Sequence, residues 1–226
     1  MCHNWCQSTL KKPNNWQWRD LIPRDDISDR LLHLTRDCNE VSAVDGLKSI
    51  LKSKQINGSS RDVRGGEKCV CFTETPIAKI ALLVQQTRQT NFRYGAFGVM
   101  ATKREVFERG GRPAIYGTEE EFRQLPDEFK FRFVKFDYAK KTDWTWEREW
   151  RFSGDTYGLD PASTTVIVPN RNWKDRIVDE YVSQEQVKQR TAMPRFPLPH
   201  VIFPWNIITF DDLGLGEPDE DHKEAQ

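Results

Sequence analysis

The segment from Thr142 to Phe152, TDWTWEREWRF, constrains the fold more than any other part of the sequence. Side chains of a β-strand point alternately to its two faces. One face of such a strand would carry Trp144, Trp146, Arg148, Trp150 and Phe152, and the other Thr145, Glu147, Glu149 and Arg151. The pattern therefore predicts a rigid strand whose tryptophans, Trp146 and Trp150 among them, are buried in the core.

Glu147 and Glu149 would lie about 7 Å apart along the polar face of this strand. Two carboxylates so close resist joint ionisation unless a cation balances them, and Arg151 follows on the same face. A solvated face with ordinary Glu–Arg pairing is the simpler interpretation. A functional site is the other, because rigid elements hold reactive groups accurately.

The remaining pattern predicts alternating strands and helices, then mainly strands. Strands are expected at residues 29–35, 68–74, 94–102, 113–116, 131–138, 164–168 and 201–210. Helices are expected from Ser42 to Asn57-Gly58, over 76–86 with Thr75 as N-cap, at 104–109, from 119, from 172 and over 183–189. This order predicts an α+β fold with its helices concentrated early.

Composition limits the domain organisation and the class of partner. The 226 residues carry 34 basic and 34 acidic side chains, so no global basic field exists to attract nucleic acid. We expect an N-terminal arm at 1–26, a single α+β domain at 27–213 and a disordered acidic tail at 214–226. No apolar run approaches the length of a membrane span, and the first residues lack the apolar core of a signal peptide.

The cysteines favour a reducing, cytoplasmic location and give no support to a metal site. The five cysteines are an odd number, and Cys69 and Cys71 are interpreted as core positions of a strand. Cys2, His3 and Cys6 lack a second ligand pair at usable spacing, so no metal is expected. A phosphate-binding loop of the P-loop or Rossmann kind is also missing from the sequence.

Two shorter motifs carry polar groups at strand ends. His33 and Thr35 lie in the first predicted strand, where a satisfied core histidine is the simpler interpretation. Thr73, Glu74 and Thr75 end the second strand, where helix capping explains them without a site. Ligands also gather at the ends of strands in open sheets, so both motifs remain site candidates.

Together these motifs resemble the ADP-ribosyltransferase fold over roughly residues 30–152. The elements that carry the resemblance are His33-Leu34-Thr35 with the following Gly46-Leu47-x-x-Ile50-Leu51, then Phe72-Thr73-Glu74, then Glu147-x-Glu149. The first is similar to the opening of DarT-like and RNA 2′-phosphotransferase-like members. A narrower set resembles the AbiGi-type abortive-infection family of bacteria: Cys71–Pro76, Tyr94-Gly95-x-Phe97-Gly98, Gly111-x-Pro113-x-Ile115-Tyr116 and Trp146–Arg151.

The resemblance implies a split, mixed or antiparallel β-sheet and NAD+ as a substrate, with no metal. It assigns Glu149 to the developing positive charge and the ribose 2′-hydroxyl, and Glu147 to the acceptor. It implies that His33 hydrogen-bonds the adenosine ribose, that Thr35 is a further NAD+-binding residue and that Thr73 braces the pocket. Tyr94 or Tyr116 would stack on nicotinamide, and Arg151 completes the candidate set.

Three functions follow as hypotheses. The first is an NAD+-dependent ADP-ribosyltransferase or NAD+ glycohydrolase in a bacterial phage-defence or toxin–antitoxin setting, acting on an unidentified protein or nucleic-acid acceptor. The second is an inactive, antitoxin-like module that senses a nucleotide or binds a partner of the defence system. The third is an RNA 2′-phosphotransferase-like enzyme, which requires basic residues to converge; Arg36, Arg61, Arg64 and Arg93 are the candidates.

Truncation after Gly214 should leave the melting temperature nearly unchanged. Residues 216–226 carry five acids in eleven residues and almost no apolar side chains, so they cannot offset the entropy of ordering. Differential scanning calorimetry of the full and truncated chains measures the difference. A fall of many degrees would show that the tail docks on the domain.

Overall fold

The computed structural model describes residues 26–38, 41–86, 95–193 and 200–214. Its main sheet has seven strands in the order β11-β10-β4-β1-β3-β8-β5. Strands β10 and β11 are parallel, and the other neighbouring pairs are antiparallel. The chain is thus an α+β protein with a mixed sheet, as predicted. The expected arm and tail, and Tyr94 and Arg93, lie outside the described residues apart from Asp26 and Gly214.

The strands of the main sheet are β1 (Arg30–Leu34), β3 (Cys69–Thr73), β4 (Gly98–Thr102), β5 (Arg112–Pro113), β8 (Glu149–Ser153), β10 (Thr165–Val168) and β11 (Asn206–Thr209). Two smaller sheets pair β2 (Gln55–Asn57) with β9 (Thr156–Gly158) and β6 (Ile115–Gly117) with β7 (Phe133–Lys135). The helices are α1 (Ala43–Ser53), α2 (Ile77–Gln86), α3 (Lys103–Glu108), α4 (Glu119–Gln124), α5 (Asp127–Lys130) and α6 (Arg171–Ala192).

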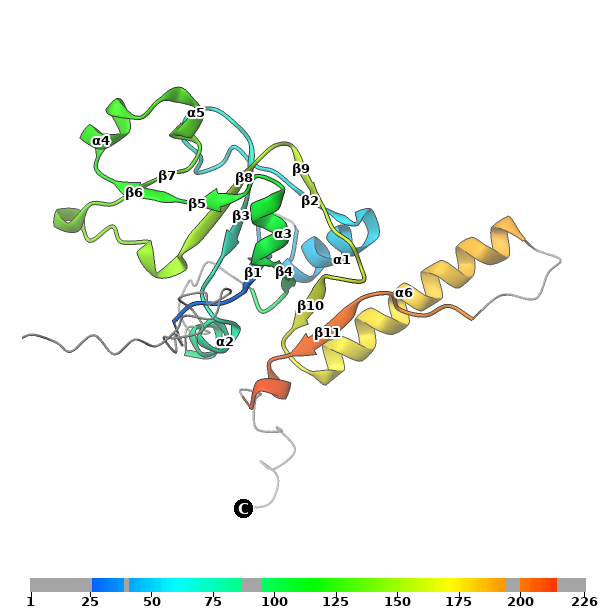
Figure 1. The fold of residues 1–226 in the computed structure, drawn as a ribbon. Helices are drawn as coiled ribbons and strands as arrows, with labels where there is room; N and C mark the ends of the chain where they lie inside the picture. The colour runs from blue at the N-terminus through cyan, green and yellow to red at the C-terminus, as the bar shows by residue number, and fades with distance from the viewer. Residues whose placement is uncertain (1–25, 39–40, 87–94, 194–199, 215–226) are drawn as a thin grey trace, which may run out of the picture.

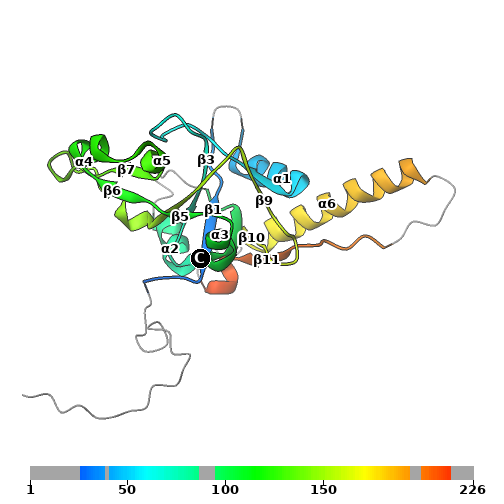
Figure 2. The same cartoon turned by 45° about the horizontal axis from the view of Figure 1, so that its top comes forward.

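Helices cover both faces of the sheet, and alternate residues of β1 enter two separate cores. Leu31 packs with Leu47 of α1 and Val106 of α3, whereas Leu32 packs with Ile80 of α2. Figure 1 shows α4, α5, β6 and β7 gathered at one end of the molecule, while α6 extends from the opposite end, and Figure 2 gives the same arrangement. Among the described residues, no helix has the length and apolar character needed to cross a membrane.

The prediction of one strand from Thr142 to Phe152 was wrong in its first half. Residues Thr145–Glu147 form the 3-10 helix η3, and Arg148 adopts a left-handed conformation with φ 47° before β8 begins. Trp146 is therefore 36% exposed and not a core residue, whereas Trp150 is 5% exposed. Trp144 is exposed to the same degree as Trp146. From Glu149 onward the alternation holds: Trp150 faces the core and Glu149 and Arg151 face the other way.

Several element boundaries also differ from prediction. Helix α1 begins after Ser42, whose hydroxyl accepts the Asp45 N–H, but it ends at Ser53, with Lys54 as C-cap, because the following residues pair with β9 as β2. The strand expected at 131–138 is reduced to β7, followed by the 3-10 helix η2 (Tyr138–Lys140). The short helix expected at 183–189 is the second half of α6, so the longest helix comes late in the chain.

Candidate functional site

The sheet is split between β1 and β3. Within the described residues these two strands are paired at one position, Leu32 with Thr73, whereas β1 pairs with β4 at five positions and β3 with β8 at five. Directly paired residues share a face, so His33 lies on the opposite face from Thr73. The opening therefore lets side chains from both faces of the sheet meet in one space.

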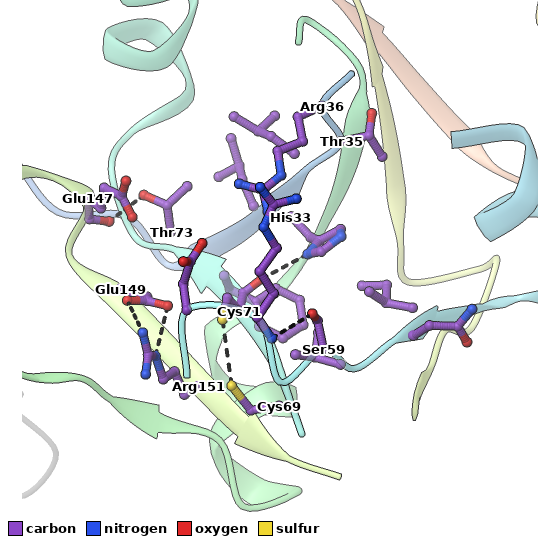
Figure 3. A pocket seen from close by; sticks show the side chains of 18 of the residues that line it. His33, Thr35, Arg36, Ser59, Cys69, Cys71, Thr73, Glu147, Glu149 and Arg151 are labelled. Carbon is purple, nitrogen blue, oxygen red and sulfur yellow. Dashed lines mark hydrogen bonds and ion pairs between the residues drawn. The ribbon is translucent and has the colours of Figure 1, made fainter. Parts of the chain in front are cut away.

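A pocket of about 720 Å³ occupies this split, a volume within the range of small-molecule and cofactor sites. Its walls include six of the residues expected from sequence: His33, Thr35, Thr73, Glu147, Glu149 and Arg151. Figure 3 shows Thr73, Glu147 and Glu149 on one side of the pocket and Thr35 on the other. Segments separated by more than a hundred residues are thus brought together in one pocket.

Glu149 and Arg151 form a buried, two-pronged ion pair in the pocket wall. Arg151 donates from Nε to one carboxylate oxygen at 2.9 Å and from Nη2 to the other at 3.1 Å. The Nη1 group of Arg151 donates to the carbonyl oxygens of Phe131 and Phe133. Burial acts to lower the pKa of Arg151, but the carboxylate of Glu149 outweighs it, so the pKa is raised and the guanidinium stays charged. Arg151 therefore holds Glu149 in one orientation and neutralises it in the absence of a ligand.

The turn that carries Glu147 is fixed by two threonines at the end of β3. The Thr73 hydroxyl donates to the Glu147 carbonyl oxygen and accepts the Thr75 N–H at 3.1 Å. The Thr75 hydroxyl donates to the Trp146 carbonyl oxygen at 2.6 Å. The sequence predicted a helix from Pro76 with Thr75 as its N-cap, whereas α2 begins at Ile77, one residue later. Thr73 does brace the pocket, through the main chain of Glu147.

Tyr116 does not line the pocket but contacts the main chain of Glu149, which does. Its hydroxyl oxygen accepts the main-chain N–H of Glu149 at 2.8 Å, and burial raises the pKa of Tyr116 to about 12. Tyr116 thus contacts the main chain of β8 and is not among the residues that line the pocket. Tyr94, the other tyrosine expected to stack, lies outside the described residues.

His33 is oriented by the main chain of β3. Its Nδ1 lies 2.8 Å from the carbonyl oxygen of Cys71, and a carbonyl oxygen only accepts, so Nδ1 carries the proton. Burial lowers the pKa of His33 more than this hydrogen bond raises it. The ring is therefore neutral near pH 7, with Nε2 as an acceptor.

The lowered pKa of His33 predicts a loss of stability on acidification. The unfolded chain takes up a proton at this residue near pH 6.5 and the folded chain does so only at lower pH, so the free energy of unfolding should fall as the pH drops below that value. One unit below it, at pH ~5.5, the loss reaches up to about 1.4 kcal/mol. Denaturant titrations above pH 6.5 and at pH ~5.5 measure the loss of unfolding free energy on acidification, which should be smaller for His33→Gln than for the wild type. An equal loss in the two proteins would contradict the assignment of this pH dependence to His33.

Thr35 lines the pocket but uses its hydroxyl within the fold. The hydroxyl lies 2.7 Å from the Ala43 carbonyl oxygen and 3.0 Å from that of Phe97. The Thr35 N–H also donates to Phe97, and its carbonyl oxygen accepts the Gly95 N–H. Thr35 therefore joins the end of β1 to the start of α1 and fixes the pocket wall.

Three of the four arginines considered from sequence line the same pocket: Arg36, Arg61 and Arg64. Arg64 is bound to both carboxylate oxygens of Glu119, and Arg61 Nη1 lies 3.2 Å from the Cys38 Sγ. Lys135 and the Arg151 described above are further basic residues in the wall. Several basic residues thus line one pocket, two of them, Arg64 and Arg151, already paired with the carboxylates of Glu119 and Glu149.

Sequence reasoning missed Cys69 and Cys71 as pocket residues. Both line the pocket, and their sulfur atoms are 3.7 Å apart. They were interpreted as core positions of a strand, but Cys71 of β3 is paired directly with Arg151 of β8. The alternation Cys69, Cys71, Thr73 along β3 was the available signal, because all three share a face. Among the described residues, no group of three or more His, Cys, Asp or Glu side chains could hold a metal ion.

No model of a known protein family matches the chain, and a search of curated proteins gives no significant match. Among solved structures, DarT of Thermus sp. 2.9 in complex with NAD+ is similar to it with 14% identity and a TM-score of 0.35. That similarity covers 80% of this chain and 96% of the DarT chain. A TM-score of this size is too low to support an inference about function.

Proposed function

We propose that the chain is an enzyme that consumes NAD+, either transferring ADP-ribose to an acceptor or hydrolysing NAD+. One observation carries the proposal: His33, Thr73, Glu147 and Glu149, from three separate motifs of the resemblance, line a single pocket in the split of the sheet. A purely structural role for these four residues would not require their side chains to line the same pocket.

Glu149 is the principal catalytic residue in this proposal. Cleavage of the bond between nicotinamide and ribose develops positive charge on the ribose, as in other oxocarbenium-like transition states. A fixed carboxylate stabilises that charge without reorganising, and such preorganised groups supply much of the rate enhancement of enzymes. Tyr116 and Arg151 act as positioning residues, because each holds Glu149 through a hydrogen bond. One carboxylate oxygen would exchange part of its contact with Arg151 for the ribose 2′-hydroxyl.

Glu147 and His33 serve the two ends of the substrate. Glu147 lies in the turn before β8, where it would orient or deprotonate the acceptor or the attacking water. The Nε2 of His33 would accept a hydrogen bond from a hydroxyl of the adenosine ribose, since Nδ1–H is directed to Cys71. The Thr73 hydroxyl keeps Glu147 in place by donating a hydrogen bond to the Glu147 carbonyl oxygen.

A binding module without turnover is the second candidate. The observation that favours it is the occupation of both Glu149 oxygens by Arg151, which leaves the carboxylate neutralised. Such a module would bind a nucleotide or a partner protein in the same pocket. It predicts NAD+ binding without nicotinamide release, or no binding at all.

The arginines of the wall keep the RNA 2′-phosphotransferase-like hypothesis open to test. Arg36, Arg61 and Arg64 line the same pocket, and recognition of a 2′-phosphate would require their guanidinium groups to meet at one point of it. An RNA that carries a 2′-phosphate should then lose that phosphate in the presence of NAD+, whereas an ADP-ribosyltransferase would leave it unchanged.

The biological setting is part of the proposal. The resemblance to the AbiGi-type family supports a bacterial phage-defence or toxin–antitoxin system, with a protein or nucleic-acid acceptor. The free thiols of Cys38, Cys69 and Cys71 fit a reducing compartment such as the cytoplasm.

Incubation of the pure chain with NAD+ tests the proposed function directly. We expect free nicotinamide to accumulate by chromatography, slowly with water and faster when the acceptor is supplied in a bacterial lysate. Calorimetry in parallel measures NAD+ binding. Binding without release in any condition would favour the second candidate, and absence of both would exclude an NAD+-dependent function.

A further inference from the structure

Cys69 and Cys71 form a pair of thiols in the wall of the pocket. They are two residues apart on β3, on the face that also carries Thr73, and the Sγ atoms are 3.7 Å apart. Cys69 is 2% exposed, Cys71 is half-buried, and both line the pocket. In Figure 3 they lie beside Arg151, below the Glu149 carboxylate. The function proposed above uses neither sulfur.

The surroundings favour one thiolate shared by the pair. The hydrogen bond from Cys71 lowers the pKa of Cys69 more than burial raises it, with help from the charge of Arg151. The same hydrogen bond, together with burial, raises the pKa of Cys71 well above its ordinary value. Thiolates, not thiols, are the nucleophiles in cysteine oxidation, so the pair is poised to react at the Cys69 sulfur.

The main chain of Cys71 connects this pair to His33. Its carbonyl oxygen accepts the hydrogen bond from Nδ1 that orients the His33 ring. On this side β3 borders the split, where no ladder with β1 holds the carbonyl in place among the described residues. A change in the backbone at Cys71 therefore moves the carbonyl oxygen that accepts the hydrogen bond from His33.

A disulfide between residues two apart on a strand requires a local bend. Their Cα atoms are about 6.6 Å apart in a regular strand, at the upper end of the range of disulfides. The sulfur atoms must also approach from 3.7 Å to bonding distance. A strained disulfide of this kind is more easily reduced than a structural one, as regulatory disulfides are.

We propose that Cys69 and Cys71 are a peroxide-sensitive dithiol whose oxidation to an intrachain disulfide moves the Cys71 carbonyl and His33, and so weakens ligand binding in the pocket. The oxidation is independent of the proposed function, but its effect on NAD+ rests on it. The Cys69 thiolate attacks one oxygen of hydrogen peroxide, the O–O bond breaks and hydroxide leaves, giving a sulfenic acid. The Cys71 sulfur then attacks the Cys69 sulfur, the S–O bond breaks and water leaves. In sum, two thiols and one peroxide give one disulfide and two waters.

Peptide mass spectrometry tests the oxidation. Trypsin cleaves after Lys68 and Lys79, so residues 69–79 form one peptide that contains both cysteines and no other. After graded exposure to hydrogen peroxide and blocking of free thiols at acid pH, this peptide should be lighter by two hydrogen atoms and carry no block. Dithiothreitol should restore both thiols. The Cys38→Ser control should behave like the wild type, whereas Cys71→Ser should stop at the sulfenic acid.

Two readouts test the coupling to the pocket. Calorimetry should show NAD+ affinity roughly three- to tenfold weaker in the oxidised chain, the usual effect of losing one hydrogen bond. The NMR signal of the His33 ring, identified by its loss in His33→Gln, should shift on oxidation and return on reduction. If the reduced chain binds no NAD+, the proposed function fails. The NMR signal of the His33 ring then still tests whether oxidation of the dithiol changes the pocket. Three outcomes would overturn the inference. Cys69 and Cys71 could both remain thiols after peroxide has already oxidised Cys38, or one of them could form a disulfide with another cysteine. The NMR signal of the His33 ring could also stay in place in the oxidised chain.

Discussion

Replacing Glu149 with glutamine should lower the rate of nicotinamide release by on the order of 100- to 1000-fold. Glutamine keeps the shape of the side chain and removes the charge, which acts chiefly on the transition state. The loss should therefore appear in kcat, with NAD+ affinity changed much less. Single-turnover release of nicotinamide and calorimetric binding of NAD+ measure the two quantities separately.

The structure supplies a matched control in Glu74→Gln. Glu74 is as buried as Glu149 and is also paired with a cation, Lys103, but it does not line the pocket. Both substitutions leave a cation without its carboxylate, the buried Arg151 in one case and the partly exposed Lys103 in the other, and both should lower stability. Only Glu149→Gln should lower turnover in protein that is still folded. Equal turnover in the two variants would remove Glu149 from the catalytic role.

Glu147→Gln separates the two parts of the reaction. If Glu147 activates the acceptor, its loss should impair transfer of ADP-ribose and spare part of the hydrolysis of NAD+. The ratio of ADP-ribose bound to the acceptor over free ADP-ribose measures this separation. An unchanged ratio with both rates reduced would indicate that Glu147 acts on the ribose with Glu149.

Four residues of the pocket could be predicted because they occupy regular strands. His33, Thr73, Glu149 and Arg151 lie in β1, β3 and β8, where the period of two fixes which side chains share a face. The resemblance implies a split sheet, but the sequence pattern does not place the split between β1 and β3, because pairing of distant strands depends on the whole sheet. The placement of Cys71 in the pocket follows from that separation.

The turn before β8 was mispredicted because its composition imitates a strand. Trp144 and Trp146 extend the alternation of Trp150 and Phe152 by two further positions. Hydrogen bonds from Thr73 and Thr75 to the carbonyls of this segment draw it into a 3-10 turn. These contacts join residues more than seventy positions apart, so a local pattern cannot show them. The same limit applies to α1, which ends early because of the pairing of β2 with β9.

Replacing Trp150 with alanine should lower the free energy of unfolding by about 3–5 kcal/mol, the usual loss for a large aromatic residue in a core. Trp150 is 5% exposed and lies between Phe72 and Pro113 in the sheet. Its Nε1 donates to Glu74 at 2.8 Å, so the substitution also removes a hydrogen bond from a buried carboxylate. Denaturant titration measures the change.

Two variants show which contact of Trp150 matters. Trp150→Phe keeps most of the apolar volume and removes the hydrogen bond to Glu74, so it should cost about 1–3 kcal/mol. Trp146→Ala is the matched control in the adjoining turn, because that side chain is 36% exposed and its carbonyl bond from Thr75 survives the substitution. We expect a loss below about 2 kcal/mol there, since less apolar surface leaves the protein interior. A loss at Trp146 as large as at Trp150 would mean that the strand extends through the turn, as the sequence pattern alone suggests.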